Sequence, residues 1–130
     1  MKDGQPRPSQ PRPIGKSVSS LPASDSSLNA EKLRGLDIYG GSGTGLPGDG
    51  DRLDAPAAIG GDKATLANQI ILGGMMESAT SRCTHALARK LKELEIPATF
   101  DFRPTGTHSW SYWENDLHKS WPMPAWSMGL

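Results

Sequence analysis

The sequence predicts an α/β fold in which parallel strands are joined by a crossover helix. Three stretches carry this prediction: an apolar run at 36–39, a long helical pattern over 63–95, and an alternating run at 98–103. A strand–helix–strand order with this spacing is a βαβ unit, whose two strands lie parallel. Because two strands alone do not make a stable sheet, the chain either is incomplete or borrows the rest of its sheet.

The first strand follows from local composition. Residues 30–35 predict one helical turn that ends at Gly35, and Leu36-Asp37-Ile38-Tyr39 predicts a short strand. The glycine-rich stretch 40–61 comes next and predicts an irregular loop.

The long helix follows from the spacing of its apolar residues. These residues recur at three- and four-residue steps, which places them on one face of a helix. Gly73-Gly74 is expected to separate a short helix, Ala64–Leu72, from this longer one, which Pro97 ends. The expected apolar face consists of Met76, Ala79, Cys83, Ala86, Leu87, Leu91 and Leu94.

The C-terminal third predicts a strand, a turn and a helix. Residues 98–103 predict a strand with Phe100 and Phe102 on one face. Ser111 and Glu114 have the spacing of a capping box, which predicts a helix over 111–119. The proline-containing segment 121–126 is expected to be non-helical.

Composition divides the chain into a tail, a domain and a short end. Residues 1–28 are rich in proline and serine and are expected to be a disordered tail, since such a stretch buries too little apolar surface to offset its ordering entropy. Residues 29–126 are expected to form the domain, and 127–130 a C-terminal tail.

Charge and cysteine content exclude several classes of function. The 130 residues contain 14 Lys+Arg and 14 Asp+Glu, and this balance, without a basic block, argues against a nucleic-acid footprint. No apolar run is long enough to span a bilayer, so no integral membrane segment is expected. The start of the chain lacks the apolar region of a secretory signal. The single cysteine, Cys83, excludes an internal disulfide framework.

The candidate site centres on His108, which lies in a turn between the second strand and the last helix. That turn falls at the carboxyl edge of the sheet, where ligands bind in open α/β folds. Histidine changes its charge near neutral pH and is the commonest general base. A packing histidine beside the aromatic residues that follow is the structural alternative.

Two sequence blocks resemble one family. The run FDFRPTGTHSWSYW (100–113) closely resembles the C-terminal block of the mycolyltransferases, which are secreted α/β-hydrolase-fold esterases that build trehalose mycolates in the cell envelope of mycolic-acid bacteria. The run MESATSR (76–82) resembles the stretch that carries the family's acidic triad residue. The likeness covers about three quarters of the chain, from residue 28 to residue 126, which implies the C-terminal part of an α/β-hydrolase fold.

The resemblance implies roles for three residues. His108 matches the family's catalytic histidine, Glu77 matches the acid that orients it, and Trp110 matches a tryptophan that lines the sugar-acceptor site. Glu77 and His108 follow successive strands and are expected to meet at the sheet edge. The implied reaction is transfer of a mycolyl or other long-chain acyl group from a lipid–sugar ester such as trehalose mycolate. For Glu77, an ordinary acid in the first turn of a helix is the alternative.

The family's catalytic triad also needs a serine nucleophile, and the sequence offers no serine in the expected position. It belongs on a G-x-S-x-G elbow between a strand and a helix, ahead of the acid. Ser17 lies in a near miss, Gly15-Lys16-Ser17-Val18-Ser19, that follows prolines, and Ser42 precedes a loop, so neither fits. The chain alone is therefore expected to be inactive, and a non-catalytic carbohydrate-binding or interaction remnant of the family is the alternative function.

No cofactor or metal is expected. Cys83, His85 and His118 are the candidate soft ligands, but their spacing matches no closed zinc pattern, and Cys83 falls on the expected apolar helix face.

Overall fold

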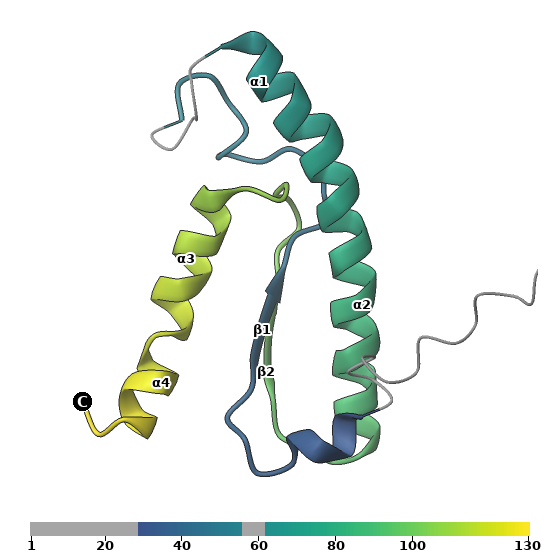
Figure 1. Ribbon diagram of the computed structural model, residues 1–130, viewed down its shortest axis with the longest axis vertical. Coiled ribbons are helices and arrows are strands. Elements are labelled where there is room, and N and C mark those ends of the chain that lie inside the picture. The colour runs from purple at the N-terminus through teal and green to yellow at the C-terminus, as the bar shows by residue number, and fades with distance from the viewer. Residues whose placement is uncertain (1–28, 56–61) are drawn as a thin grey trace, which may run out of the picture.

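The computed structural model describes residues 29–55 and 62–130, which form a mixed helix–strand arrangement around two parallel strands (Figure 1). The expected tail 1–28, with Ser17, and part of the expected loop lie outside the described residues. In chain order the elements are η1 (Ala30–Leu33), β1 (Tyr39–Ser42), α1 (Lys63–Asn68), η2 (Gln69–Gly73), α2 (Gly74–Glu93), β2 (Thr99–Phe102), α3 (Trp110–Ser120) and α4 (Pro122–Ser127).

The parallel strand pair is confirmed. β1 and β2 lie side by side with Tyr39 opposite Thr99 and Ser42 opposite Phe102. The first strand is shifted by three residues from the predicted 36–39. Gly40, Gly41 and Ser42 pair with β2 rather than opening the loop. These small residues suit a strand covered on both sides: a Cβ at Gly40 would contact Phe100, and one at Gly41 would contact Asp116 of α3. Figure 1 shows the two strands between α2 and α3.

The helical region contains no break at its glycines, so that prediction is wrong. The chain passes from α1 through the π-helical η2 directly into α2. Gly73 and Gly74 keep helical backbone angles, and their missing side chains permit close packing instead. A Cβ at Gly74 would lie 2.6 Å from the carbonyl oxygen of Gly45, so the glycine-rich loop contacts the helix at this point.

The apolar core lies at the end of the fold that holds the amino ends of both strands. Its buried members are Ala30, Leu91 and Ile96, and Ile38 and Phe100 pack against them. The predicted apolar face of α2 is correct only in its C-terminal half, which carries Leu87, Leu91 and Leu94. Met76 and Cys83, predicted for the same face, are exposed.

The helix predicted over 111–119 is confirmed as α3, but its predicted capping box is wrong. Ser109, not Ser111, precedes α3, and its side chain makes no capping hydrogen bond. The segment predicted to be non-helical forms α4, with Pro122 at its first position. A proline is tolerated there because the first helical amides have no intrahelical partner to lose. α4 reaches Ser127, the first residue of the expected C-terminal tail.

Candidate functional site

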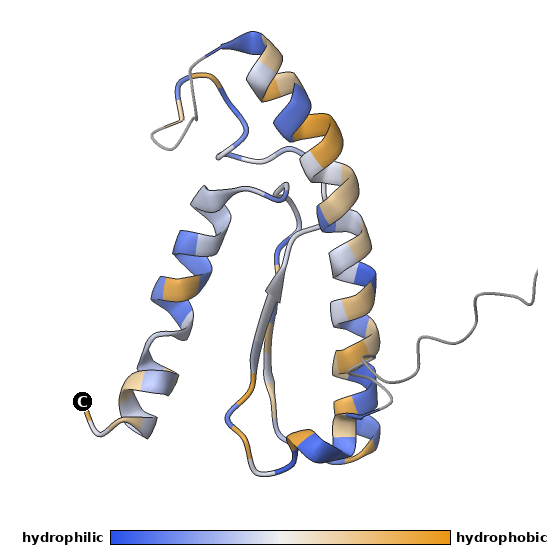
Figure 2. Cartoon of the chain, viewed as in Figure 1, coloured by the Kyte–Doolittle hydropathy of each residue, from blue (hydrophilic) through white to orange (hydrophobic). Residues whose placement is uncertain are grey.

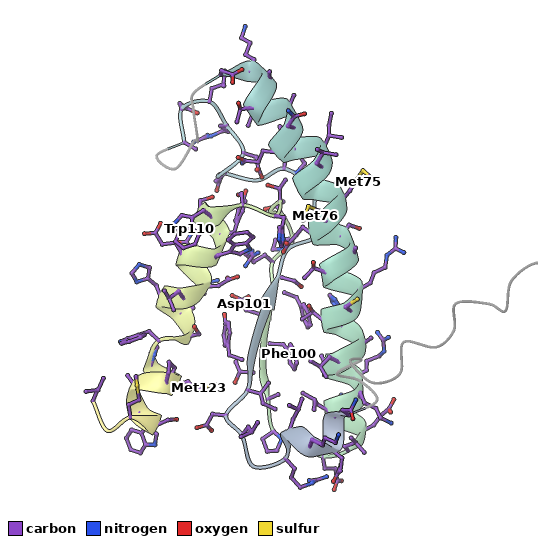
Figure 3. The ribbon with its side chains drawn as sticks, viewed as in Figure 1. Met75, Met76, Phe100, Asp101, Trp110 and Met123 are labelled. Atoms are coloured by element: carbon purple, nitrogen blue, oxygen red, sulfur yellow. The ribbon has the colours of Figure 1, made fainter. Side chains whose placement is uncertain are left out.

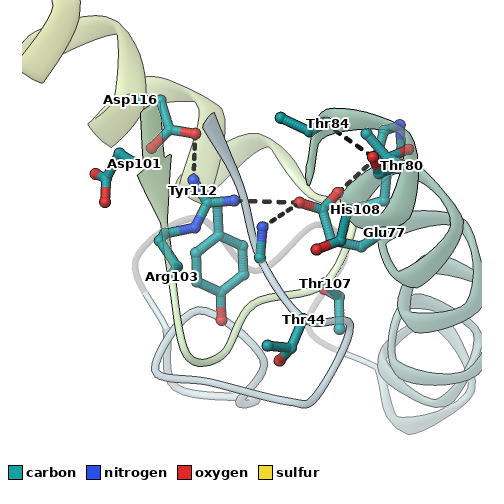
Figure 4. A network of polar contacts seen from close by, with 12 residues as sticks. Thr44, Glu77, Thr80, Thr84, Asp101, Arg103, Thr107, His108, Tyr112 and Asp116 are labelled. Atoms are coloured by element: carbon teal, nitrogen blue, oxygen red, sulfur yellow. Dashed lines mark hydrogen bonds and ion pairs between the residues drawn. The ribbon is translucent and has the colours of Figure 1, made fainter. Parts of the chain in front are cut away.

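Glu77 and His108 meet at the carboxyl edge of the two strands, as the topology predicted. The Nδ1 atom of His108 lies 2.9 Å from Oε2 of Glu77. Glu77 is 2% exposed, whereas the His108 side chain keeps 29% of its surface accessible. An ionised carboxylate only accepts hydrogen bonds, so the Nδ1 atom must carry the proton. The pair therefore combines a buried acid with a histidine that reaches the surface, and Figure 4 shows the two side chains side by side.

The other oxygen of Glu77 is fixed by two donors. The backbone N–H of Gly43 donates to Oε1 at 2.6 Å, and the Arg103 guanidinium donates to the same atom at 3.3 Å. Arg103 also forms an ion pair with Asp116 of α3. The carboxylate is thus held on both oxygens, and the cation beside it is shared with a second acid (Figure 4). Glu77 lies in the first turn of α2, as the alternative supposes, but α2 continues directly from η2, so its first amides are not a free helix N-terminus.

The backbone of His108 is held by the π-helical segment. The N–H of His108 donates to the carbonyl oxygen of Gly73 at 3.1 Å. π-Helical turns change the hydrogen-bond partners of the carbonyls around them and are frequent at functional sites. The Trp113 ring packs edge-on against the imidazole, with centroids 4.6 Å apart. These contacts fix the ring while its second nitrogen, Nε2, has no hydrogen-bond partner among the described residues.

Sequence reasoning missed Asp51, which ties the glycine-rich loop to the turn before His108. Asp51 is 5% exposed, and its carboxylate accepts hydrogen bonds from Thr107, Tyr112, Gln69 and the backbone of Gly48. Burial acts to raise the pKa of Asp51, but these four hydrogen bonds outweigh it and the pKa is lowered overall. The expected irregular loop is therefore anchored at one buried carboxylate.

The same network raises the pKa of Tyr112 to about 12. Burial is the largest cause, and the hydrogen bond to the negative Asp51 adds to it, because both disfavour the phenolate. Tyr112 is thus a neutral donor under ordinary conditions. Only the Gly-Asp-Gly-Asp run around Asp51 hinted at this network in the sequence.

Trp110, the third predicted site residue, lies at the start of α3 and is 61% exposed. Its ring contacts that of Trp113 edge-on, with centroids 6.2 Å apart. Trp113 therefore contacts both the His108 imidazole and the exposed ring of Trp110.

The structure offers no nucleophile for His108 within residues 29–55 and 62–130. No hydroxyl or thiol there is hydrogen-bonded to the His108 ring. Ser42 is 1% exposed, and its Oγ atom has no partner among the described residues, so it faces the interior rather than a substrate.

In that same part of the chain, no group of three or more metal-binding side chains gathers. Its helices also include none with the length and apolar character needed to cross a bilayer. No family model matches the chain, and a comparison with curated proteins finds no match either.

Proposed function

We propose that this chain is the C-terminal part of an α/β-hydrolase-fold acyltransferase that resembles the trehalose mycolyltransferases. The observation that carries the proposal is the 2.9 Å contact between buried Glu77 and partly exposed His108 at the carboxyl edge of a parallel strand pair. The order of acid before histidine along the chain is that of α/β-hydrolases. The FDFRPTGTHSWSYW run around His108 adds the resemblance to this particular family.

In this proposal, Glu77 is a positioning residue and His108 is the general base. Nε2 of His108 takes the proton of a serine hydroxyl as the serine oxygen attacks the ester carbonyl. The leaving alkoxide receives that proton, and an acceptor hydroxyl or water then attacks the acyl-serine by the reverse sequence. Glu77 stabilises the imidazolium that forms in each step, and Asp116 offsets the charge of Arg103 beside it. The serine comes from outside residues 29–55 and 62–130.

The proposed substrate is a lipid–sugar ester such as trehalose mycolate. Trp110 supplies an exposed indole close to the His108 imidazole, through Trp113. An aromatic face suits stacking on a pyranose ring, so Trp110 would help to place the acceptor sugar.

A chimaera tests the proposed role. Residues 29–126 of this chain would replace the matching C-terminal segment of a trehalose mycolyltransferase that keeps its own serine. We expect acyl transfer that Glu77→Gln and His108→Ala each reduce by at least about a hundredfold, in line with the loss of a general base. The exposed acid Glu114 of α3 supplies the control, and Glu114→Gln should leave turnover unchanged. A folded, trehalose-binding chimaera without turnover would refute the proposal.

The chain alone should not catalyse the reaction. We expect hydrolysis of a short activated ester at the rate of the His108→Ala variant, since no serine is aligned with Nε2. Robust turnover that both Glu77→Gln and His108→Ala abolish would contradict this expectation.

A second candidate function, carbohydrate binding without catalysis, is favoured by the exposure of Trp110. It predicts quenching of tryptophan fluorescence by trehalose that Trp110→Ala removes. Trp126 of α4 is still more exposed and lies far along the chain from His108, so Trp126→Ala is the matched control. Equal quenching in both variants would eliminate this candidate.

A further inference from the structure

We propose that the side of α2 beside the loop at Thr44 carries a second site, which binds a single-chain anionic amphiphile such as an alkyl phosphate. Two adjoining grooves lie along this face, one apolar and one basic, with volumes of about 510 and 520 Å³. They share Thr44, Ser78 and Arg82, so they are continuous. Neither Glu77 nor His108 lines them, and the proposal does not depend on acyl transfer.

The basic groove gathers two arginines and a histidine, and no acid lies among them. Arg82, His85 and Arg89 follow one another at three- and four-residue steps along α2. Within the described parts of the chain, neither arginine forms an ion pair, and no carboxylate lines either groove. An arginine guanidinium binds phosphate through paired N–H donors, so two free arginines on one face favour an anionic group.

Hydroxyl groups and a fixed imidazole complete the basic groove. Thr44, Ser78 and Ser81 line it beside the cations. His85 stacks on Phe102 with ring centroids 3.7 Å apart, and its Nδ1 atom donates to the carbonyl oxygen of Ser81 at 2.8 Å. The imidazole is therefore held in place before a ligand binds, which lowers the entropy cost of binding.

The apolar groove exposes large side chains that a ligand chain would cover. Leu46, Ile71 and Met75 line it, and all three are more than half exposed, with Met75 at 69%. In Figure 3 the Met75 side chain points away from the strands, and in Figure 2 the ribbon between α1 and α2 is coloured as hydrophobic. Covering such surface removes apolar area from water, which favours binding of an alkyl chain.

Because the two grooves join at Arg82, the ligand that fits them must have both a charged head and an alkyl chain. A small anion would use only the basic groove, and a neutral lipid would leave two arginines unpaired. A ligand with a charged head and one alkyl chain satisfies both grooves at once, with the head at Arg82 and Arg89 and the chain along Ile71 and Met75.

Binding of dodecyl phosphate below its micelle concentration to the full chain, followed by calorimetry, tests the proposal. We expect Arg82→Gln and Arg89→Gln each to weaken binding about tenfold, as for loss of a charge-assisted hydrogen bond. Dodecyl maltoside, with the same chain and a neutral head, and inorganic phosphate alone should both bind at least about tenfold more weakly. Arg52→Gln is the control, since Arg52 is exposed but lines neither groove.

Three results would each overturn the proposal. The first is equal binding of the neutral dodecyl compound, and the second is equal binding of inorganic phosphate. The third is an effect of Arg52→Gln as large as that of Arg82→Gln, which would mean that only general charge attraction is at work.

Discussion

Replacing Asp51 by alanine should destabilise the fold more than any other single change in the glycine-rich loop. Its carboxylate is the acceptor for the hydroxyl groups of Thr107, which is 0% exposed, and of buried Tyr112. It also accepts a hydrogen bond from Gln69, which leads into η2. Asp51→Ala removes a carboxylate that joins these three segments around His108.

The expected loss follows from the donors that are left unsatisfied. A buried donor without an acceptor costs about 1–3 kcal/mol, so the two hydroxyl groups together account for roughly 2–6 kcal/mol. The half-buried Gln69 amide turns to water at little cost. Because neighbouring losses are not additive, we expect about 3 kcal/mol.

Urea unfolding followed by tryptophan fluorescence measures this loss, with Asp49→Ala as the control. Asp49 is exposed in the same loop, so its replacement should change the free energy of unfolding by less than about 0.5 kcal/mol. If Asp51→Ala costs no more than Asp49→Ala, the loop is not anchored as described.

The lowered pKa of Asp51 makes the stability of the fold decrease at acid pH. A carboxyl with a folded-state pKa below its unfolded value stabilises the fold above about pH 4 and loses this contribution as the pH falls through the folded value. The Asp51→Asn variant should therefore lose less stability between pH 4 and lower pH than the unaltered chain. An identical acid profile for the two proteins would contradict the lowered pKa.

Two further predictions concern the tyrosines and the paired glycines. Burial raises the pKa of Tyr39, and it raises that of Tyr112 to about 12, so phenolate absorbance should develop above pH 10. Stability should fall as the pH rises from about 10 to 12. A folded chain in which both tyrosines titrate at pH 10 would contradict this. Gly74→Ala should lower the melting temperature, because its Cβ would lie 2.6 Å from the Gly45 carbonyl oxygen. Gly73→Ala, whose nearest neighbour would be 3.4 Å from the added Cβ, should be neutral or stabilising by up to about 1 kcal/mol. The reverse order of the two variants would refute the close loop–helix contact.

The sequence was sufficient for the parallel strand pair, which follows from strand–helix–strand order. The meeting of Glu77 with His108 was expected because the family resemblance picked out Glu77, and parallel strands bring their carboxyl ends to one edge. The extent of β1 was not predictable from local preference. Gly40 and Gly41 are poor strand formers, and they belong to the strand because Phe100 and Asp116 occupy the space that their side chains would fill.

The rest of the site depends on long-range contacts that no local pattern carries. Gly73 and Gly74 resemble a helix break, yet the loop at Gly45 and the amide of His108 give them tertiary partners. Arg103 was predicted only as a strand end, and its place between Glu77 and Asp116 requires α2, β2 and α3 to be assembled first.

The most direct test of the central claim is the protonation pattern of the His108 ring, measured by long-range ¹H–¹⁵N correlation on the full chain at a pH where the ring carries one proton. If Glu77 accepts a hydrogen bond at Nδ1, as in the structure, His108 should carry its proton on Nδ1 and leave Nε2 bare, and Glu77→Gln should alter the Nδ1 signal. Glu114→Gln should leave the spectrum as it is. A His108 ring with its proton on Nε2, unchanged by Glu77→Gln, would contradict the account.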